Sequence, residues 1–323
     1  MEETTSKHSI NLIGFLVAFF GALLFSTKAI IVKKAFADVG ADALTLLTLR
    51  MLFSLPFYIG AAFLVSFKKF NRKMTTKEWA IVIVLGTFGY YLSSLLDFLG
   101  LQYISAGLER LILFLYPSFV VLINAVLFKE KIKGIIIRAL LLSYLGIAVA
   151  YFGELQFETG NPNFYWGSFL ILLCSITFAI YIAGSGYIIP KVGASKFTAY
   201  ALLCSTAGVF LHYILRGDYA SVKSSMDLWW YGILLALIAT VLPTFMLSFA
   251  LKKIGASNVA IISSIGPVST ILQAHFVLGE PVFAEQILGT AMVLAGILLL
   301  SIKPKESHPV NLPEPEIARM EKE

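Results

Sequence analysis

The chain has 323 residues, of which 58% are hydrophobic, and its mean hydropathy is +0.84. Soluble domains contain about 45–50% apolar residues, so this composition excludes an ordinary soluble protein and indicates a membrane protein. The formal net charge is +6. Because Lys and Arg of membrane proteins collect in the loops on one side, this charge does not indicate a nucleic-acid partner, and we expect none.

The chain begins with a polar segment, residues 1–9, which we expect to be a cytoplasmic tail. Apolar runs of about 20 residues follow, and each is long enough to cross the hydrocarbon of a bilayer. The runs cover residues 10–32, 43–67, 79–101, 106–128, 132–152, 166–188, 195–215, 228–251, 256–278 and 283–302. Backbone groups in lipid must pair within their own segment, so we predict an all-α integral membrane protein with ten transmembrane helices. Residues 303–323, rich in Pro, Glu and Lys, predict a disordered cytoplasmic tail.

Part of the chain repeats. Residues 101–130 align with residues 251–280 without a gap, and seven of the 30 positions are identical. The identical pairs include Pro117 with Pro267 and Glu130 with Glu280. We therefore predict two repeats of five helices, residues 10–152 and 153–302.

The distribution of positive charge predicts the orientation. If the N-terminus lies in the cytoplasm, 18 Lys and Arg lie on the cytoplasmic side. The external segments hold only Lys33, Lys34, Arg216 and Lys223, with Arg110 at the start of a helix. The positive-inside rule thus places both termini in the cytoplasm. Five is an odd number, so the second repeat must be inverted, which is the architecture of many secondary transporters.

Each repeat carries the same succession of features: small residues, an apolar run with a Pro inside it, a Glu at its end, and a Gly in the next helix. They are Ser105–Ala106–Gly107, Pro117, Glu130 and Gly146, then Gly255–Ala256–Ser257, Pro267, Glu280 and Gly296. With Arg50 near the start of the second helix, residues 10–302 resemble the EamA-type permeases of the drug/metabolite transporter superfamily. The resemblance implies export or exchange of amino acids, nucleosides, drugs or sugar derivatives. One difference is Phe25–Ser26–Thr27–Lys28, where many members have an uncharged segment.

Charged residues inside a span are costly in lipid and mark candidate functional sites. Counting along each helix from its end puts five of them at similar depth in the external half of the first repeat. They are Lys28, Arg50, Asp97, Glu109 and Arg110. The aligned positions of the second repeat hold Tyr181, Leu203, Leu247, Val259 and Ala260. This asymmetry favours a role in binding or coupling over a requirement of the fold.

We predict a substrate-binding site in which Arg50 and Lys28 anchor a carboxylate or similar acidic group. Asp97 and Glu109 set the charge of these anchors, and Tyr116 and Tyr181 line the central cavity. Alternative interpretations remain: Lys28 could extend to the lipid headgroups, Glu109 and Arg110 could face the interface, and the tyrosines could serve ordinary packing.

Two further predictions concern the repeated motif. Glu130 and Glu280 are expected to cap the N-terminus of the helix that follows each of them, with proton coupling as the alternative. Pro117 and Pro267 lie in mid-helix, where each is expected to free a backbone carbonyl and permit bending, either as a gate or as a packing kink.

The sequence has no phosphate-binding loop, HExxH motif, Cys/His cluster or nucleophile motif, so we expect no enzyme, cofactor or metal site. We predict a secondary transporter that exports small organic metabolites such as amino acids by alternating access through the bacterial inner (plasma) membrane. Its partners would be the substrate, the lipid bilayer and, as a further candidate, a coupled ion or proton. The alternatives are a transporter of lipid-linked or amphipathic, drug-like substrates and a non-transporting membrane sensor or assembly partner.

Overall fold

The computed structural model describes residues 12–66, 73–128, 134–157, 160–217, 219 and 226–301, and its regular elements in these ranges are helices. The first half contains α1 (Leu12–Val39), α2 (Ala43–Ser66), α3 (Thr76–Val84), the π-helical segment η1 (Leu85–Leu92), α4 (Ser93–Gly100), α5 (Ala106–Leu113), α6 (Tyr116–Phe128) and α7 (Gly134–Phe157). The second half contains α8 (Phe164–Val192), α9 (Ala194–Arg216), α11 (Met226–Ala236), η2 (Leu237–Val241), α12 (Leu242–Ser263), α13 (Gly266–Gln273), η3 (Ala274–Leu278) and α14 (Ala284–Ser301).

These helices correspond to the ten predicted spans. Some spans consist of consecutive segments: α3, η1 and α4 form the third span, and α5 and α6 form the fourth. Among the described residues, nine helices are long and apolar enough to cross a membrane, and Ala284–Leu299 is a shorter apolar helix. The predicted all-α integral membrane fold is therefore confirmed.

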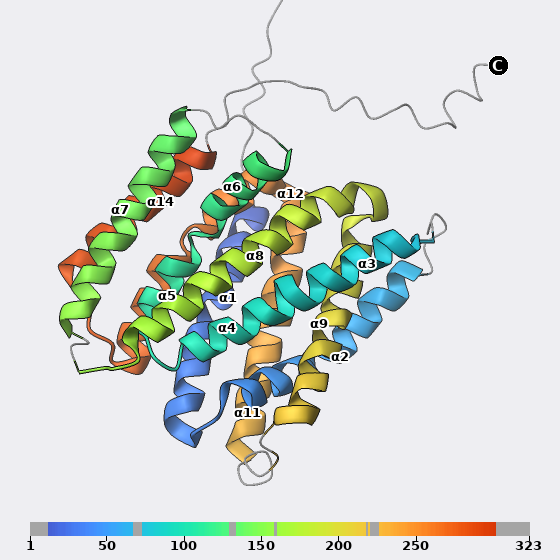
Figure 1. Cartoon of the computed structure of the whole chain (residues 1–323), viewed down its shortest axis with the longest axis horizontal. Helices are drawn as coiled ribbons and strands as arrows, with labels where there is room; N and C mark the ends of the chain where they lie inside the picture. The colour runs from blue at the N-terminus through green and yellow to red at the C-terminus, as the bar shows by residue number, and fades with distance from the viewer. Residues whose placement is uncertain are drawn as a thin grey trace, which may run out of the picture.

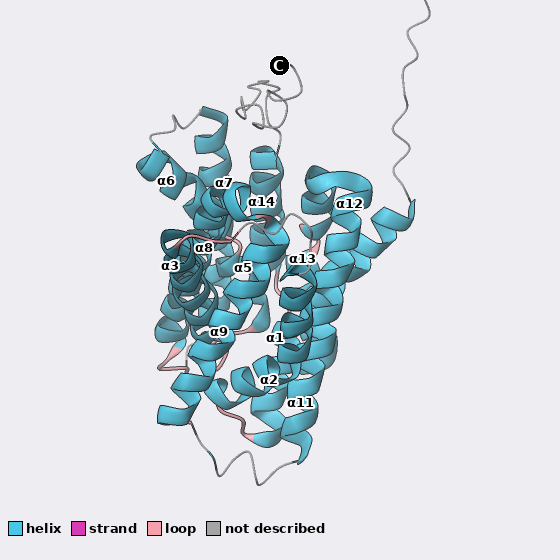
Figure 2. Ribbon diagram, turned by 90° about the vertical axis from the view of Figure 1, so that its right-hand side faces the viewer, coloured by secondary structure: helices cyan, strands magenta, loops and turns pink. Residues whose placement is uncertain are grey.

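The two repeats run in opposite directions through one bundle. The first turn of α1, in dark blue, and the last turn of α14, in red, lie at the same end of the molecule (Figure 1). The start of α11 lies at the opposite end (Figure 2). The repeats pack against each other where α7 meets α14 and where α1 meets α12. Between α7 and α14 a Cβ added to Gly146 would lie 2.6 Å from the carbonyl oxygen of Gly289, so glycine permits this close approach.

Both repeats interrupt the same helix at the same aligned place. In the first repeat α5 ends at Leu113 and α6 begins at Tyr116; in the second, α12 ends at Ser263 and α13 begins at Gly266. Each proline, Pro117 or Pro267, is the second residue after the interruption. Proline has no N–H to donate, and it is tolerated in the first turn of a helix. The sequence placed these prolines in mid-helix, whereas each lies in the first turn of a new helix, so the helix is interrupted just before the proline.

The turns between the first and second helices of each repeat also match. Gly40 has φ of 59° and Gly193 has φ of 88°, and they stand 153 residues apart in the alignment of the repeats. Positive φ is the left-handed region that glycine adopts without steric cost. These two glycines therefore allow the chain to turn sharply between α1 and α2 and between α8 and α9.

The structure corrects the predicted end of the first span. The sequence placed it near residue 32, but α1 continues to Val39, so Lys28 lies 11 residues before the helix end rather than a few. The added turns carry charged side chains, and the lysines among them have partners. The Nζ of Lys33 donates to the carbonyl oxygen of Ile104 (2.7 Å), and Lys34 pairs with Asp38 one turn later (3.0 Å). Such contacts let a helix continue beyond its apolar run.

Candidate functional site

A cavity of about 420 Å³ lies between the repeats. Its wall is formed by Ala22, Phe25, Lys28, Arg50, Tyr90, Ser93, Ser94, Asp97, Arg110, Leu113, Phe114, Tyr116, Cys174, Phe178, Leu247, Leu251, Val259 and Ser263. The charged residues all come from the first repeat, and the second contributes mainly apolar side chains. The wall extends to Leu251 and Val259, which flank the non-helical Gly255 that joins the eighth and ninth spans.

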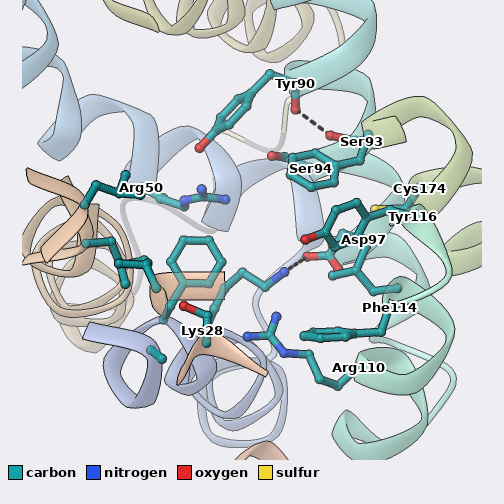
Figure 3. Close-up of a pocket in the computed structure, with 18 residues that line it drawn as sticks. Lys28, Arg50, Tyr90, Ser93, Ser94, Asp97, Arg110, Phe114, Tyr116 and Cys174 are labelled. Carbon is teal, nitrogen blue, oxygen red and sulfur yellow. Dashed lines mark hydrogen bonds and ion pairs between the residues drawn. The ribbon is translucent and has the colours of Figure 1, made fainter. Parts of the chain in front are cut away.

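Lys28 is held inside the bundle by two carboxylates. Its Nζ lies 2.6 Å from Oδ2 of Asp97 and 3.5 Å from Oε1 of Glu109. The side chains of Lys28, Asp97 and Glu109 are 11%, 3% and 0% exposed. Figure 3 shows the Lys28 side chain directed at Asp97. Lys28 therefore does not extend to the headgroups, and the three residues form one buried ionic cluster.

Arg50 stands apart from that cluster. It projects from α2 into the cavity (Figure 3), donates its Nε to Oγ1 of Thr240 (3.0 Å), and its guanidinium lies 5.7 Å from the ring centre of Phe98. In the described part of the chain no Asp or Glu oxygen lies within 4.0 Å of Arg50. Thr240 belongs to η2, so a side chain of the second repeat orients the guanidinium.

Arg110 links the broken helix of the second repeat to the site. Its Nη2 donates to Oγ of Ser26 (3.3 Å), and the same Ser26 hydroxyl lies 3.3 Å from the carbonyl oxygen of Gly266, at the start of α13. The guanidinium also lies 5.8 Å from the ring centres of Phe25 and Phe114. Arg110 is therefore held by a hydroxyl and by aromatic faces rather than by a carboxylate.

The structure brings together four of the six predicted binding residues on the cavity wall: Lys28, Arg50, Asp97 and Tyr116. Glu109 lies behind Lys28 and does not line the cavity. Tyr181 does not line the cavity either. The centre of its ring lies 5.7, 6.1 and 5.5 Å from the ring centres of Tyr90, Phe178 and Phe197.

Some wall residues were not identified from the sequence. Ser93 and Ser94 lie on the cavity, and Tyr90, Ser93, Ser94 and Asp97 follow the i, i+3, i+4, i+7 spacing of one helix face. This spacing could have identified the two serines from the sequence, because it places their hydroxyl groups on the same helix face as Asp97 and the hydroxyl group of Tyr90. Thr240, which orients Arg50, had no comparable signal.

Glu280 caps a different helix from the one predicted. Both of its carboxylate oxygens accept the backbone N–H of Ala106 (3.1 Å each), at the start of α5 in the other repeat, and Oε1 lies 3.3 Å from Nζ of Lys33. The prediction of a cap on the following helix was wrong because α5 and α14 begin near each other in the inverted bundle. Glu130, for which the same role was predicted, lies outside the described residues.

No group of three or more His, Cys, Asp or Glu in the described ranges is arranged to hold a metal ion. The cavity wall offers charged groups, hydroxyls and aromatic rings.

Comparison with known proteins agrees with this architecture. The profile of the EamA-like transporter family matches residues 12–152 and 165–302. The chain is 29% identical over 292 residues to the uncharacterized transporter YcbK of Bacillus subtilis (strain 168), covering 89% of this chain and 92% of that protein. It is 20% identical over 293 residues to the uncharacterized inner membrane transporter YicL of Salmonella typhimurium, covering 90% and 95%. One solved crystal structure has the same fold, with a TM-score of 0.61 at 16% identity, covering 91% of this chain and 99% of that one.

The fold and these matches define a multi-pass membrane transporter. The chain belongs to the EamA-like transporter family.

Proposed function

We propose that this protein is a secondary transporter of small organic metabolites that carry an acidic group, such as amino acids, and that it exports them by alternating access. The observation that carries the proposal is Arg50, a buried guanidinium that lines the cavity and has no carboxylate partner in the described chain. A guanidinium presents paired N–H donors that match a carboxylate. The cavity of about 420 Å³ is within the usual range for small-molecule sites.

The charge balance supports the same substrate class. Lys28 is held by Asp97 and Glu109, whereas Arg50 and Arg110 are held by hydroxyls and aromatic rings. Three cations and two anions leave one positive charge at the site if all are ionised. An acidic group on the substrate would reduce this positive charge, and a buried charge is stable only when it is paired.

Alternating access is supported by the inverted repeats and by the two interrupted helices, whose free ends face a shared cavity. We assign the two moving bodies to the repeats at residues 10–152 and 153–302. The charge distribution supports a cytoplasmic location of both termini, with the tails 1–9 and 303–323, in a bacterial cell. The cavity extends towards the predicted cytoplasmic connection at Gly255, and this favours loading from the cytoplasm and export.

A second candidate is an amphipathic or drug-like substrate. The wall contributed by the second repeat is apolar, with Leu247, Leu251, Val259 and Phe178, and Phe25 and Phe114 add aromatic surface from the first repeat. Such a wall suits a substrate with a large apolar body, whose binding would not depend on an acidic group.

The experiment that separates these candidates is thermal stabilisation of the detergent-purified protein by a panel of amino acids, organic acids, nucleosides and amphipathic drugs. A ligand at 100 times its dissociation constant adds about 2.7 kcal/mol to the free energy of unfolding. We expect one acidic or zwitterionic class to stabilise the protein, and Arg50→Leu to weaken its binding about 10- to 100-fold, because charge-assisted hydrogen bonds contribute roughly 1.5–3 kcal/mol.

The control is Arg216→Leu, because Arg216 is an exposed residue of the same type at the end of α9. It should leave binding unchanged. Arg50→Lys keeps the charge but loses the paired donors, so its affinity should fall between those of the native protein and Arg50→Leu. Stabilisation by neutral amphipathic compounds alone, unchanged in Arg50→Leu, would reject the acidic substrate and support the second candidate. Flux into proteoliposomes of the identified compound then tests transport itself.

A further inference from the structure

We propose that Lys28, Asp97 and Glu109 form a proton-binding site in which one exchangeable proton is shared between the carboxyl groups of Glu109 and Asp97. The uptake of this proton is linked to binding of acidic cargo at Arg50. The link to cargo rests on the proposed function, whereas the proton site itself is independent of it.

The first observation is that each carboxyl group keeps one oxygen without a partner. Oδ2 of Asp97 and Oε1 of Glu109 contact Nζ of Lys28, but Oδ1 of Asp97 and Oε2 of Glu109 are buried and make no hydrogen bond to other groups of the described chain. Buried polar atoms of native proteins are nearly always hydrogen-bonded, and an unpaired carboxylate oxygen costs several kcal/mol. A triad built only for stability would satisfy both oxygens.

The second observation is that the two carboxyl groups contact the same ammonium group, because Nζ of Lys28 lies 2.6 Å from Oδ2 of Asp97 and 3.5 Å from Oε1 of Glu109. Two ionised carboxylates repel each other and have no hydrogen to share. One proton on Glu109 turns its carboxyl group into a donor and that of Asp97 into its acceptor. The same proton reduces the cluster from a net charge of −1 to zero in a place where the Glu109 side chain is 0% exposed.

The surrounding groups do not remove the need for this proton. The titratable and charged groups that face the cluster from neighbouring elements are Arg110 of α5, Arg50 of α2, Cys174 of α8, and Tyr90 and Tyr116 of the cavity wall. Arg110 directs its Nη2 to Ser26, and Arg50 directs its Nε to Thr240. Neither guanidinium lies within 4.0 Å of a carboxylate oxygen in the described residues, so both act on the cluster only at longer range.

The position of the cluster gives the proton a route. Asp97 and Lys28 line the cavity, whereas Glu109 lies directly behind Lys28. Because both carboxyl groups contact Nζ of Lys28, we place the route of the proton between cavity water and Glu109 past Asp97. Cargo and proton reach their sites through the same cavity, as coupling in one alternating-access cycle requires.

Electrostatics fixes the sign of the coupling. An acidic group that binds at Arg50 brings negative charge near Asp97 and Glu109, which makes the protonated form of the pair more favourable. Binding is reciprocal, so lowering the pH must strengthen binding of the acidic cargo by the same factor. We expect cargo binding to take up a proton from solution.

The proton site is tested without cargo. Infrared difference spectra of the purified full-length protein, recorded during a pH titration, should show the carbonyl stretch of a protonated carboxylic acid that appears and disappears reversibly. Glu109→Gln should remove this band. Glu285→Gln, a partly exposed carboxylate in the first turn of α14, should leave it intact. Asp97→Asn keeps Glu109 but changes its hydrogen-bond acceptor, so the band should shift in frequency and in its pH midpoint.

The two proposals fail in different ways. The absence of a titrating band, or a band that survives in Glu109→Gln, overturns the proton site whatever the cargo is. A band that is present while no acidic compound binds rejects the acidic cargo and leaves the proton site standing. With a bound compound, a pH-sensitive dye in weak buffer should report proton uptake on binding, and this uptake should vanish in Glu109→Gln. Proton release, or no change in the native protein, would overturn the link.

Discussion

The two repeats share their architecture but not their chemistry. Both break a helix at the same aligned place, α5 from α6 and α12 from α13, and both contain a π-helical segment in the helix before it, η1 and η2. Segments of this kind recur at functional sites because they free backbone groups and re-aim side chains. Here η2 supplies Thr240 to Arg50, and η1 places Tyr90 on the cavity wall.

The charges do not follow this symmetry. Where the first repeat has Lys28, the second has Tyr181, whose ring packs in an aromatic cluster with Phe178 and Phe197. Where the first has Asp97, the second has Leu247 on the apolar side of the cavity. The second repeat fills these aligned positions without charged residues. This asymmetry supports the proposal that the ionic cluster of the first repeat serves binding.

The largest effect expected from this comparison comes from removing the central cation. Lys28→Met should lower the free energy of unfolding by about 3–5 kcal/mol, because it leaves Asp97 and Glu109 buried without their partner. The aligned change in the second repeat, Tyr181→Phe, should cost less than about 1 kcal/mol. Chemical unfolding in detergent measures both.

A triple variant sharpens this test. Lys28→Met combined with Asp97→Leu and Glu109→Val gives the first repeat the apolar character of the second. Because buried ionic clusters can be replaced by apolar groups at little cost, it should recover most of the lost stability. A triple variant as unstable as Lys28→Met alone would show that the fold requires the cluster. The uncharged positions of the second repeat would then not indicate what the first repeat can tolerate.

A smaller effect is expected at the interface between α7 and α14, where the two repeats contribute equivalent glycines. Gly146 and Gly296 hold equivalent positions, in α7 and α14, and each faces the other helix closely. A Cβ at Gly146 would lie 2.6 Å from the carbonyl oxygen of Gly289, and one at Gly296 would lie 2.7 Å from that of Ala139. Gly146→Ala and Gly296→Ala should each destabilise the protein by about 1–3 kcal/mol, measured by thermal unfolding.

The control for these glycines is Gly186→Ala in α8, where an added Cβ meets nothing within 4 Å. It should be neutral or stabilise the protein by up to about 1 kcal/mol, because alanine favours helix. A large difference between Gly146→Ala and Gly296→Ala would break the symmetry that the fold suggests.

The sequence predicted the fold well because the relevant information is local. The length of each apolar run indicates a span, and Pro117 and Pro267 mark where each helix departs from a regular path. Counting residues placed Lys28, Asp97 and Glu109 in the external half of their helices, but the count for Lys28 was short because α1 continues to Val39. The three residues nevertheless meet in the structure.

The sequence did not predict which way each side chain faces. In a bilayer the lipid-facing and protein-facing sides of a helix are both apolar, so the pattern that reveals the buried face of a soluble helix is weak. Tyr181 was therefore expected on the cavity and lies behind Tyr90 and Phe178. Glu280 was assigned to the next helix because its contact with Ala106 depends on how the inverted repeats meet.

That contact supplies the smallest of the predicted effects. Glu280→Gln should lower the free energy of unfolding by about 0.5–1.5 kcal/mol, because it weakens the cap on α5 and removes the ion pair with Lys33. Lys33→Met removes the ion pair and the hydrogen bond from Nζ to the carbonyl oxygen of Ile104, while both oxygens of Glu280 still accept the N–H of Ala106. A loss in Glu280→Gln no larger than that in Lys33→Met would argue against the cap as the main contribution of Glu280. A loss in Glu280→Gln that greatly exceeds the loss in Lys33→Met would identify the cap between repeats as the main contribution, a contact that the sequence of either repeat alone does not reveal.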